Sequence, residues 1–334
     1  MQVDGIVTVG CAIFGAKQNL SESELQQMSP KPPGLRGSAT VLLLREGNSR
    51  VEILLTRRHA NMNFMAGLWV YPGGTLDPAD TSSQALSRIS KTARNHCAGI
   101  LSRGAMRGFS TEHALGMFVA ACRETFEEVG ILLANDAGGR ACEASLVARL
   151  QTRRKVILEF PAAFSQMLVD EDLVIDASAM VYWAHWITPS AAPKRFDTHF
   201  FIIPAPEGQP VCIDTSEATE WKWLDPAAAL SAHARDELPL SPPTVLTLQE
   251  VRDSFMAHGS LRGMLESETR REVATIIPKA ISGVQGNYTL MPWHPDYQAA
   301  PGEGVAPESS FPEHLRRLPG RVNRKHDFSG KPVP

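Results

Sequence analysis

Three glutamates on one expected helix are the residues of this sequence best suited to chemistry. Apolar residues recur at three- and four-residue steps over 118–129, which predicts a helix with one apolar face. Glu124 precedes Glu127 by three residues and Glu128 by four, so the three carboxylates project from one region of the opposite face. Like charges this close repel each other, and hard carboxylate oxygens select Mg²⁺ or Mn²⁺. The spacing therefore predicts a divalent metal site, and the alternative is a solvated acidic helix face.

The residues around this helix make the pattern more specific. Arg123 adjoins the glutamates and can orient a carboxylate or neutralise part of their charge. Gly130 is the expected residue at the C-terminal end of the helix. Upstream, a strand over 69–71 leads into a Pro-Gly-Gly turn at 72–74. An Arg-Glu-x-x-Glu-Glu-x-Gly run downstream of such a turn favours a functional site over a chance acidic helix.

The two segments together resemble the signature of the Nudix hydrolase superfamily, G-x5-E-x7-R-E-U-x-E-E-x-G-U, where U is aliphatic. Its second half matches residues 123–131, with Thr125 at a position that is usually aliphatic. Its first half begins at Gly74, and Asp80 stands at the position of the first Glu. Residues 81–122 separate the two halves, 42 residues where the family has seven, so the motif holds an insertion of 35.

An interrupted motif is typical of one Nudix subgroup, which is similar to the peroxisomal coenzyme A diphosphatase. That subgroup also resembles this chain in the Tyr-Pro-Gly-Gly-Thr-Leu-Asp run at 71–77, in Arg-Phe-Asp-Thr at 195–198 and in Pro-Pro-Thr at 242–244. The resemblance spans residues 37–260. It implies an α/β fold of the α+β kind: a Nudix-type α/β/α sandwich with a mixed central sheet, a mostly helical insertion and C-terminal helical additions.

The resemblance also implies a chemistry, the metal-dependent hydrolysis of a nucleoside diphosphate linked to another moiety. The metal is then held by Glu124, Glu127 and Glu128 together with the carbonyl of Gly74. Arg123, Glu124 and Glu127 are the implied catalytic residues. Glu127 and Glu128 are expected as primary ligands and Glu124 as a ligand or a base, and which carboxylate deprotonates the water stays open.

The substrate class follows from residues 54–74, which are similar to a coenzyme A signature, L-L-T-x-R-[SA]-x3-R-x3-G-x3-F-P-G-G. His59 replaces the small residue and Asn63 the second arginine. Arg57 and Arg58 alternate at a strand end, so at most one of them faces a ligand and the other is a surface charge. The resemblance favours coenzyme A or an acyl-coenzyme A, cleaved to a phosphopantetheine and 3′,5′-ADP. The missing arginine favours ADP-ribose, NADH or a nucleotide sugar.

Further substrate contacts are expected from Asp80 and from Arg195 and Asp197, which share one side of a predicted strand. A salt bridge that fixes the hairpin explains the second pair equally well. Glu217 and Glu220 are candidates for an additional metal carboxylate, although another role suits each of them better.

The insertion over 81–117 is basic, with five Arg or Lys residues against one Glu and a net charge of +4. These basic residues are Arg88, Lys91, Arg94, Arg103 and Arg107. A basic lid would suit the 3′-phosphate of coenzyme A. A solvated helical face or a dimer contact is the plainer explanation.

Strands and helices alternate along the rest of the chain, as in an α/β or α+β sandwich. Strands are expected over 37–44, 51–56, 180–187 and 195–203, and helices from 226 and over 242–256. The predicted organisation is an N-terminal extension over 1–36, a Nudix domain over 37–260 and a C-terminal extension over 261–334. The last 34 residues hold six Pro and four Gly, so we expect an irregular tail there.

Composition excludes several classes of protein. A chain of 334 residues that is 43% hydrophobic can bury a sizeable core. Its net charge of −3 supplies no field for nucleic acid or an anionic membrane, so neither is an expected partner. Five scattered cysteines without a CxxC pair fit a reducing, cytoplasmic location. The expected partner is a small nucleotide diphosphate, a homodimer is compatible with the superfamily, and a nucleotide-sensing module without catalysis is the alternative.

Overall fold

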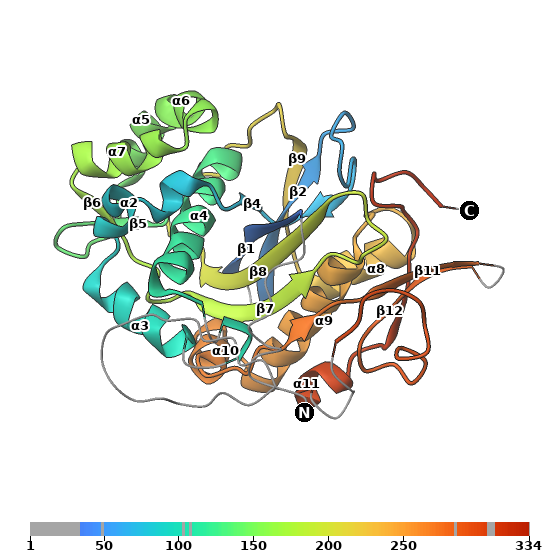
Figure 1. Ribbon diagram of the computed structural model, residues 1–334. Coiled ribbons are helices and arrows are strands. Elements are labelled where there is room, and N and C mark those ends of the chain that lie inside the picture. Colours follow the sequence, from blue (N-terminus) through green and yellow to red (C-terminus); the bar gives the residue numbers. More distant parts are fainter. Residues whose placement is uncertain are drawn as a thin grey trace, which may run out of the picture. The chain divides into compact units, whose positions relative to one another are not determined.

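A mixed sheet of eight strands runs through the described part of the chain (Figure 1). The computed structural model describes residues 34–47, 50–101, 104–106, 109–283, 286–305 and 311–333. The strands of the sheet are β1 Leu35–Gly47, β2 Arg50–Arg58, β3 Trp69–Val70, β4 Gly73–Thr75, β7 Val181–Ile187, β8 Arg195–Pro204, β9 Ala218–Leu224 and β10 Thr275–Ile276. Their order is β10-β7-β8-β1-β2-β3, with β4 paired to β1 and β9 paired to β2. β8 pairs with β1 and β10 with β7 in parallel, and the expected hairpins β1–β2 and β7–β8 are confirmed.

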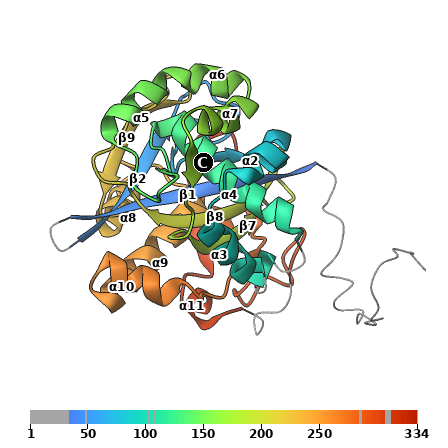
Figure 2. The ribbon, with the colours of Figure 1, turned by 90° about the vertical axis from the view of Figure 1, so that its left-hand side faces the viewer.

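Helices cover both faces of this sheet, as the resemblance predicts. They are α2 Ser83–Ser87, α3 Lys91–Leu101, α4 Thr111–Val129, α5 Ala144–Leu150, α6 Arg154–Glu159, α7 Ala162–Asp170, α8 Pro226–Ala234, α9 Pro242–His258, α10 Leu261–Glu268 and α11 Glu313–Arg316. Side chains of β1 alternate: Val41 and Leu43 belong to the core under α4, whereas Leu42 and Leu44 belong to the core under α8–α10. Figure 2 shows the sheet between α5–α7 on one side and α9–α10 on the other. No helix among these described residues has the length and apolar composition needed to cross a membrane.

α4 begins earlier than the sequence pattern indicates. The expected helix starts at residue 118, but Ser110 caps a helix that starts at Thr111, and its Oγ accepts a hydrogen bond from the His113 N–H. The helix ends at Gly130 with φ 70°, as expected. The apolar residues that mark the helix begin late because α4 is buried on nearly every side, between the sheet and α2, α3 and α6. The solvated acidic face, which was the alternative to a metal site, is therefore wrong.

The insertion over 81–117 is mostly helical in its described residues, as expected. α2, α3 and the first residues of α4 make it up, and it leads directly into the helix that carries the glutamates. A small two-stranded antiparallel sheet of β5 Ala134–Asp136 and β6 Leu173–Ile175 follows α4, with α5, α6 and α7 between its strands. Two of the basic residues of the insertion, Arg103 and Arg107, lie outside the described residues.

The chain after α10 is regular as far as residue 290, and its last 34 residues are mostly irregular in their described part, as expected. β10 extends the central sheet, and β11 Lys279–Gly283, β12 Gly286–Leu290 and β13 Arg321–Asn323 form a second antiparallel sheet. After β13 the chain follows the loop between β2 and β3: the Met65 N–H donates to the Phe328 carbonyl (3.1 Å) and the Ala66 N–H to the Ser329 carbonyl (3.0 Å). Gly330 has φ 94°, and a Cβ there would lie 2.1 Å from the Ala66 carbonyl oxygen, so glycine is needed for this approach. Contacts group residues 34–334 as one unit, and the division at residue 260 stays a prediction.

Candidate active site

The glycine turn and α4 meet at one edge of β1. β4 pairs antiparallel with β1, which places Gly74 opposite Ala39. Gly73 has φ 154°, and a Cβ there would lie 2.3 Å from the Ala39 carbonyl oxygen. A Cβ at Gly74 would lie 2.2 Å from the carboxyl carbon of Glu124. Only glycines allow the backbone to approach both β1 and the glutamate this closely.

Arg123 is the centre of the polar cluster and is almost fully buried. Its Nε and Nη2 donate to the two carboxylate oxygens of Asp80 at 2.8 and 2.9 Å. Its Nη1 donates to Oε1 of Glu124 and to Oε1 of Glu127, both at 3.0 Å, and Nη2 also reaches the Thr75 carbonyl. Asp80 also completes the capping box of the 3₁₀ turn at Pro78–Thr81, because its Oδ2 accepts a hydrogen bond from the N–H of the N-cap residue Asp77 at 2.8 Å. The Asp80–Arg123 pair therefore joins the two ends of the insertion, which explains how the interrupted motif keeps its geometry.

The carboxylates of the cluster repel one another in a place with little water. Burial, with the neighbouring charges of Glu127 and Glu217, raises the pKa of Glu124 to about 8. Burial also raises the pKa of Glu127 and, with the charges of Glu124 and Glu217, raises that of Glu128 well above its usual value. The Gly73 N–H, which donates to Oε2 of Glu128 at 3.1 Å, only partly opposes this.

A cavity of about 410 Å³ opens beside this cluster. Glu124, Glu128 and Glu217 line it together with the glycine turn, whereas the side chain of Glu127 does not. The remaining walls are largely apolar, with Met62, Phe64, Met65, Leu68, Trp186, Phe196, Phe200 and Phe328 among the lining residues. The cavity therefore joins an acidic end to an apolar wall.

Among the residues predicted to contact substrate, the structure places only Arg58 in the cavity lining. Its Nε donates to the Phe64 carbonyl at 3.1 Å, and its charge opposes the raised pKa of Glu128. Arg57 points the other way and forms a half-exposed ion pair with Glu220 at 2.6 Å, as strand alternation requires. Asp80 lies beneath Arg123 and does not line the cavity.

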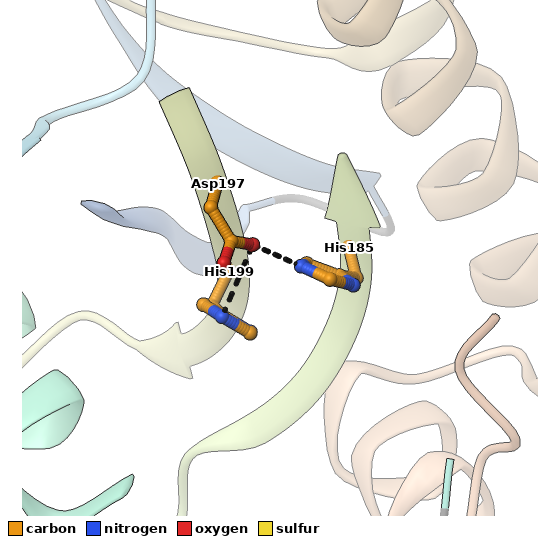
Figure 3. A group of neighbouring side chains, drawn as sticks. All are labelled: His185, Asp197 and His199. Carbon is orange, nitrogen blue, oxygen red and sulfur yellow. Dashed lines mark hydrogen bonds and ion pairs between the residues drawn. The ribbon is translucent and has the colours of Figure 1, made fainter. Parts of the chain in front are cut away.

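Arg195 and Asp197 also lie outside the cavity lining, and each has a different partner. Arg195 forms an ion pair with Glu303 at 2.5 Å. Asp197 lies with His185 and His199 on β7 and β8 (Figure 3), and all three are buried in the core on the α4 side of the sheet. The neighbouring Phe196 lines the cavity on the other side. The two residues therefore do not form the salt bridge that was the alternative interpretation.

The His185–Asp197–His199 cluster is a hydrogen-bonded network that extends to Tyr182 and Thr275. Asp197 accepts a hydrogen bond from Nε2 of His185, and Nε2 of His199 lies 3.6 Å from the same oxygen (Figure 3). Nδ1 of His199 bonds to the Tyr182 hydroxyl at 2.8 Å, and Nδ1 of His185 to Oγ1 of Thr275 at 2.9 Å. The two imidazole rings stack 11° from parallel, so their in-plane lone pairs do not converge on one point. The arrangement fits a structural network better than a metal centre.

Sequence reasoning underrated two parts of the site. Glu217 was only a weak candidate, although its place just before β9 brings it into the cavity lining. Residues 324–328 also line the cavity, and no local pattern marks them, because their position depends on contacts with a loop about 260 residues earlier in the chain. None of the described residues of the insertion lines the cavity; Arg88, for example, pairs with Asp172 at 3.1 Å.

Comparison with known proteins agrees with this geometry. A family model described as the NUDT19 Nudix domain matches residues 36–251. Two curated relatives are named acyl-coenzyme A diphosphatase NUDT19: the Xenopus laevis protein is 25% identical over 86% of this chain and 84% of its own length, and the Gallus gallus protein is 26% identical over 79% and 80%.

A solved NUDIX hydrolase from Alicyclobacillus acidocaldarius has the same fold. It superposes with a TM-score of 0.55 at 25% identity and covers 70% of this chain and 96% of its own. The expected Nudix fold and superfamily are thus confirmed. The chain belongs to the NUDT19 Nudix domain family and is a Nudix hydrolase.

Proposed function

We propose that the protein is a metal-dependent diphosphatase that hydrolyses coenzyme A or an acyl-coenzyme A to a phosphopantetheine and 3′,5′-ADP. One observation carries the proposal: the acidic cluster opens on a cavity whose other walls are largely apolar. A diphosphate bound at the acidic end would place a pantetheine arm and its acyl group along apolar side chains. The names of the curated relatives, acyl-coenzyme A diphosphatases, support the same substrate class.

The donor set of the cluster fits a divalent cation. We propose Glu124, Glu127, Glu128 and the carbonyl of Gly74 as ligands of Mg²⁺ or Mn²⁺, with Glu217 as an additional carboxylate. All of these groups are hard oxygen donors. The repulsion that raises the pKa of the glutamates is the repulsion that a cation between them would relieve.

A bound divalent cation supplies positive charge for the diphosphate oxygens and a water of lowered pKa. The residues of the chain itself supply positioning. Arg123 holds Glu124 and Glu127 from the side of Asp80, so these carboxylates have fixed orientations. Arg58 lies in the cavity lining near Glu128, where a guanidinium can bind a non-bridging phosphate oxygen. Which carboxylate accepts the proton of the water stays open.

The substitution that favoured other substrates lies outside the cavity lining. Asn63, at the position of the second arginine in the coenzyme A signature, is exposed and does not line the cavity, whereas its neighbours Met62 and Phe64 do. Replacement of an arginine at this position therefore does not argue for ADP-ribose, NADH or a nucleotide sugar.

Product analysis by chromatography tests this function. The protein, with Mg²⁺ or Mn²⁺, is given coenzyme A, an acyl-coenzyme A, ADP-ribose, NADH and a nucleotide sugar, with Glu124→Gln as the control. We expect selective cleavage of coenzyme A and its thioester, and a loss of turnover by orders of magnitude in the variant. Faster cleavage of ADP-ribose or NADH would show that coenzyme A is not the substrate. Binding of a compound without cleavage of any would indicate a nucleotide-sensing module.

A further inference from the structure

The wall of the cavity formed by the end of the chain differs in charge from the wall formed by α4. Arg324, Lys325 and His326 line the cavity from this segment. The loop between β2 and β3 holds the segment in place through the hydrogen bonds to Phe328 and Ser329. Asp327 lines the cavity beside them. One cavity thus has a cluster of carboxylates on one wall and mainly basic side chains on another.

Arg324 is a cation that interacts with the carboxylate of Asp327 only beyond ion-pair distance. Its Nη2 donates to Oγ of Ser282 at 2.9 Å and lies 3.5 Å from the Ile281 carbonyl, while its buried Nε has no hydrogen-bond acceptor. Within the described residues it forms no ion pair at 4.0 Å or less. Its neighbour Lys325, by contrast, is held by Asp236 at 2.5 Å. A buried donor without an acceptor is costly, so an acceptor is expected at Arg324 from outside the protein.

His326 repeats this feature two residues later. Its Nδ1 is also buried and has no hydrogen-bond partner among the described residues. Burial lowers the pKa of His326, mainly by disfavouring the charged imidazolium. With its proton on Nδ1, His326 would donate a hydrogen bond from the same short segment as the Arg324 guanidinium. Two such donors match a group that only accepts hydrogen bonds and carries negative charge.

We propose that Arg324 and His326 form a second anion subsite that binds a phosphate monoester of the substrate. This inference rests on the proposed function, because coenzyme A carries one phosphate beyond its diphosphate, on the 3′ oxygen of the ribose. The acidic end of the cavity is suited to the diphosphate through a cation, whereas the 3′-phosphate needs hydrogen-bond donors. Asp327 is the carboxylate beside these donors, and its Oδ1 is already occupied by hydrogen bonds from Ser329 and Lys331. The subsite thus makes the end of the chain, and not the basic insertion, the reader of the 3′-phosphate.

Paired substrates test the subsite. We compare kcat/KM for coenzyme A and for 3′-dephospho-coenzyme A in the wild type and in Arg324→Gln, with Arg321→Gln as a matched control. Arg321 lies on the same segment, is exposed and stands over the Tyr288 ring outside the cavity. We expect Arg324→Gln to reduce kcat/KM for coenzyme A by about ten- to a hundredfold and to leave the dephospho substrate within about twofold. Equal loss with both substrates, or no discrimination by the wild type, would overturn the proposal.

Calorimetric binding of 3′,5′-ADP and of AMP separates the subsite from the reaction. Wild-type protein should bind 3′,5′-ADP more tightly than AMP, and Arg324→Gln and His326→Gln should each reduce this difference, while Arg321→Gln should not. If the wild type cleaves neither coenzyme, the proposed function fails, but this binding difference still decides the subsite. Thermal melts of each variant confirm folding, and Arg324→Lys, which keeps the charge, should retain part of the preference. Equal binding of the two nucleotides by the wild type would contradict the subsite.

Discussion

Two buried polar clusters of this protein, one around Arg123 and one around Asp197, differ in how many carboxylates they gather. The first gathers Asp80, Glu124 and Glu127 around one guanidinium and has Glu128 and Glu217 close by. The second holds a single carboxylate between two imidazoles, with a hydroxyl on each outer nitrogen. Burial is therefore not what distinguishes a candidate active site here. The distinguishing features are an excess of like charge and a cavity beside it.

The two clusters also differ in their access to the cavity. Glu124 and Glu128 line the cavity, whereas His185, Asp197 and His199 are all less than 5% exposed and line no part of it. The electrostatic repulsion in the first cluster can be relieved by a ligand that enters. The second does not gather like charges among its described residues, and the hydroxyls of Tyr182 and Thr275 bond to its outer nitrogens inside the protein.

The largest expected effect comes from removing one charge of the acidic cluster. Glu128→Gln should lower kcat by about 10²- to 10³-fold, because a proposed metal ligand and its charge are lost. The same variant should melt no lower than the wild type in EDTA, since a repelled, buried carboxylate has been removed. Steady-state kinetics and melts measure both quantities. Glu220→Gln is the control, because Glu220 pairs with Arg57 away from the cavity, and a similar loss of turnover there would contradict the assignment.

Removing Asp80, the bidentate partner of Arg123, should lower stability more than removing any other hydrogen-bond partner of Arg123. Asp80→Ala leaves a buried guanidinium without its bidentate carboxylate and should cost about 3–5 kcal/mol in the free energy of unfolding. Activity should fall as well, because Arg123 then no longer orients Glu124. Asp77→Ala, which removes only the N-cap of the same turn, should cost about 1 kcal/mol. Urea titrations compare the two, and equal costs would show that Asp80 acts only as a cap.

Disrupting the cluster around Asp197 should lower the stability of the protein and leave its turnover almost unchanged. Asp197→Asn should cost about 1–3 kcal/mol, since it disturbs the bonds to His185 and His199. In folded protein kcat should change by less than about threefold, because the cluster lies outside the cavity lining. Asp172→Asn, a change in an exposed ion pair with Arg88, provides the surface control. A drop in kcat comparable to that of Glu128→Gln would abolish the distinction between the two clusters.

Metal-free protein should lose stability as the pH rises from about 5 to about 8. Burial raises the pKa of Glu124 to about 8 and raises those of Glu127 and Glu128, so the folded state binds more protons than the unfolded state in this window. The free energy of unfolding therefore falls as the pH increases. Thermal melts in EDTA across this range, repeated with saturating Mn²⁺, measure the slope, which the cation should flatten. If Mn²⁺ leaves the slope unchanged, the acidic cluster does not bind the metal.

The smallest effects should distinguish two adjacent arginines. Arg58→Gln removes a cavity-lining cation and should lower kcat/KM by about tenfold. Arg57→Gln breaks a half-exposed ion pair with Glu220 and should change kcat/KM by less than about twofold and stability by less than about 1 kcal/mol. Kinetics of the two variants under identical conditions test this. If Arg57→Gln lowers kcat/KM more than Arg58→Gln does, the side chain of Arg57, and not that of Arg58, faces the cavity.

Much of the acidic cluster could be read from the chain because it depends on short-range geometry. Helical spacing brings Glu124, Glu127 and Glu128 together, and the Pro-Gly-Gly turn marks where the backbone must approach them. Strand alternation likewise predicts that only one of Arg57 and Arg58 faces the cavity. The same rule separates Asp197 from its neighbour Phe196, but it does not say which face carries the site.

The sequence by itself determined the superfamily, the fold class and the local geometry of the carboxylates, because these depend on residue spacing within single elements. Only the tertiary structure decided that Asp80 joins the two ends of the insertion to Arg123, that Glu217 faces the cluster, and that residues 324–328 close the cavity. Each of these contacts joins segments distant in the chain, and their formation depends on how the sheet pairs and on which surfaces are buried together. Local sequence patterns do not predict such long-range contacts.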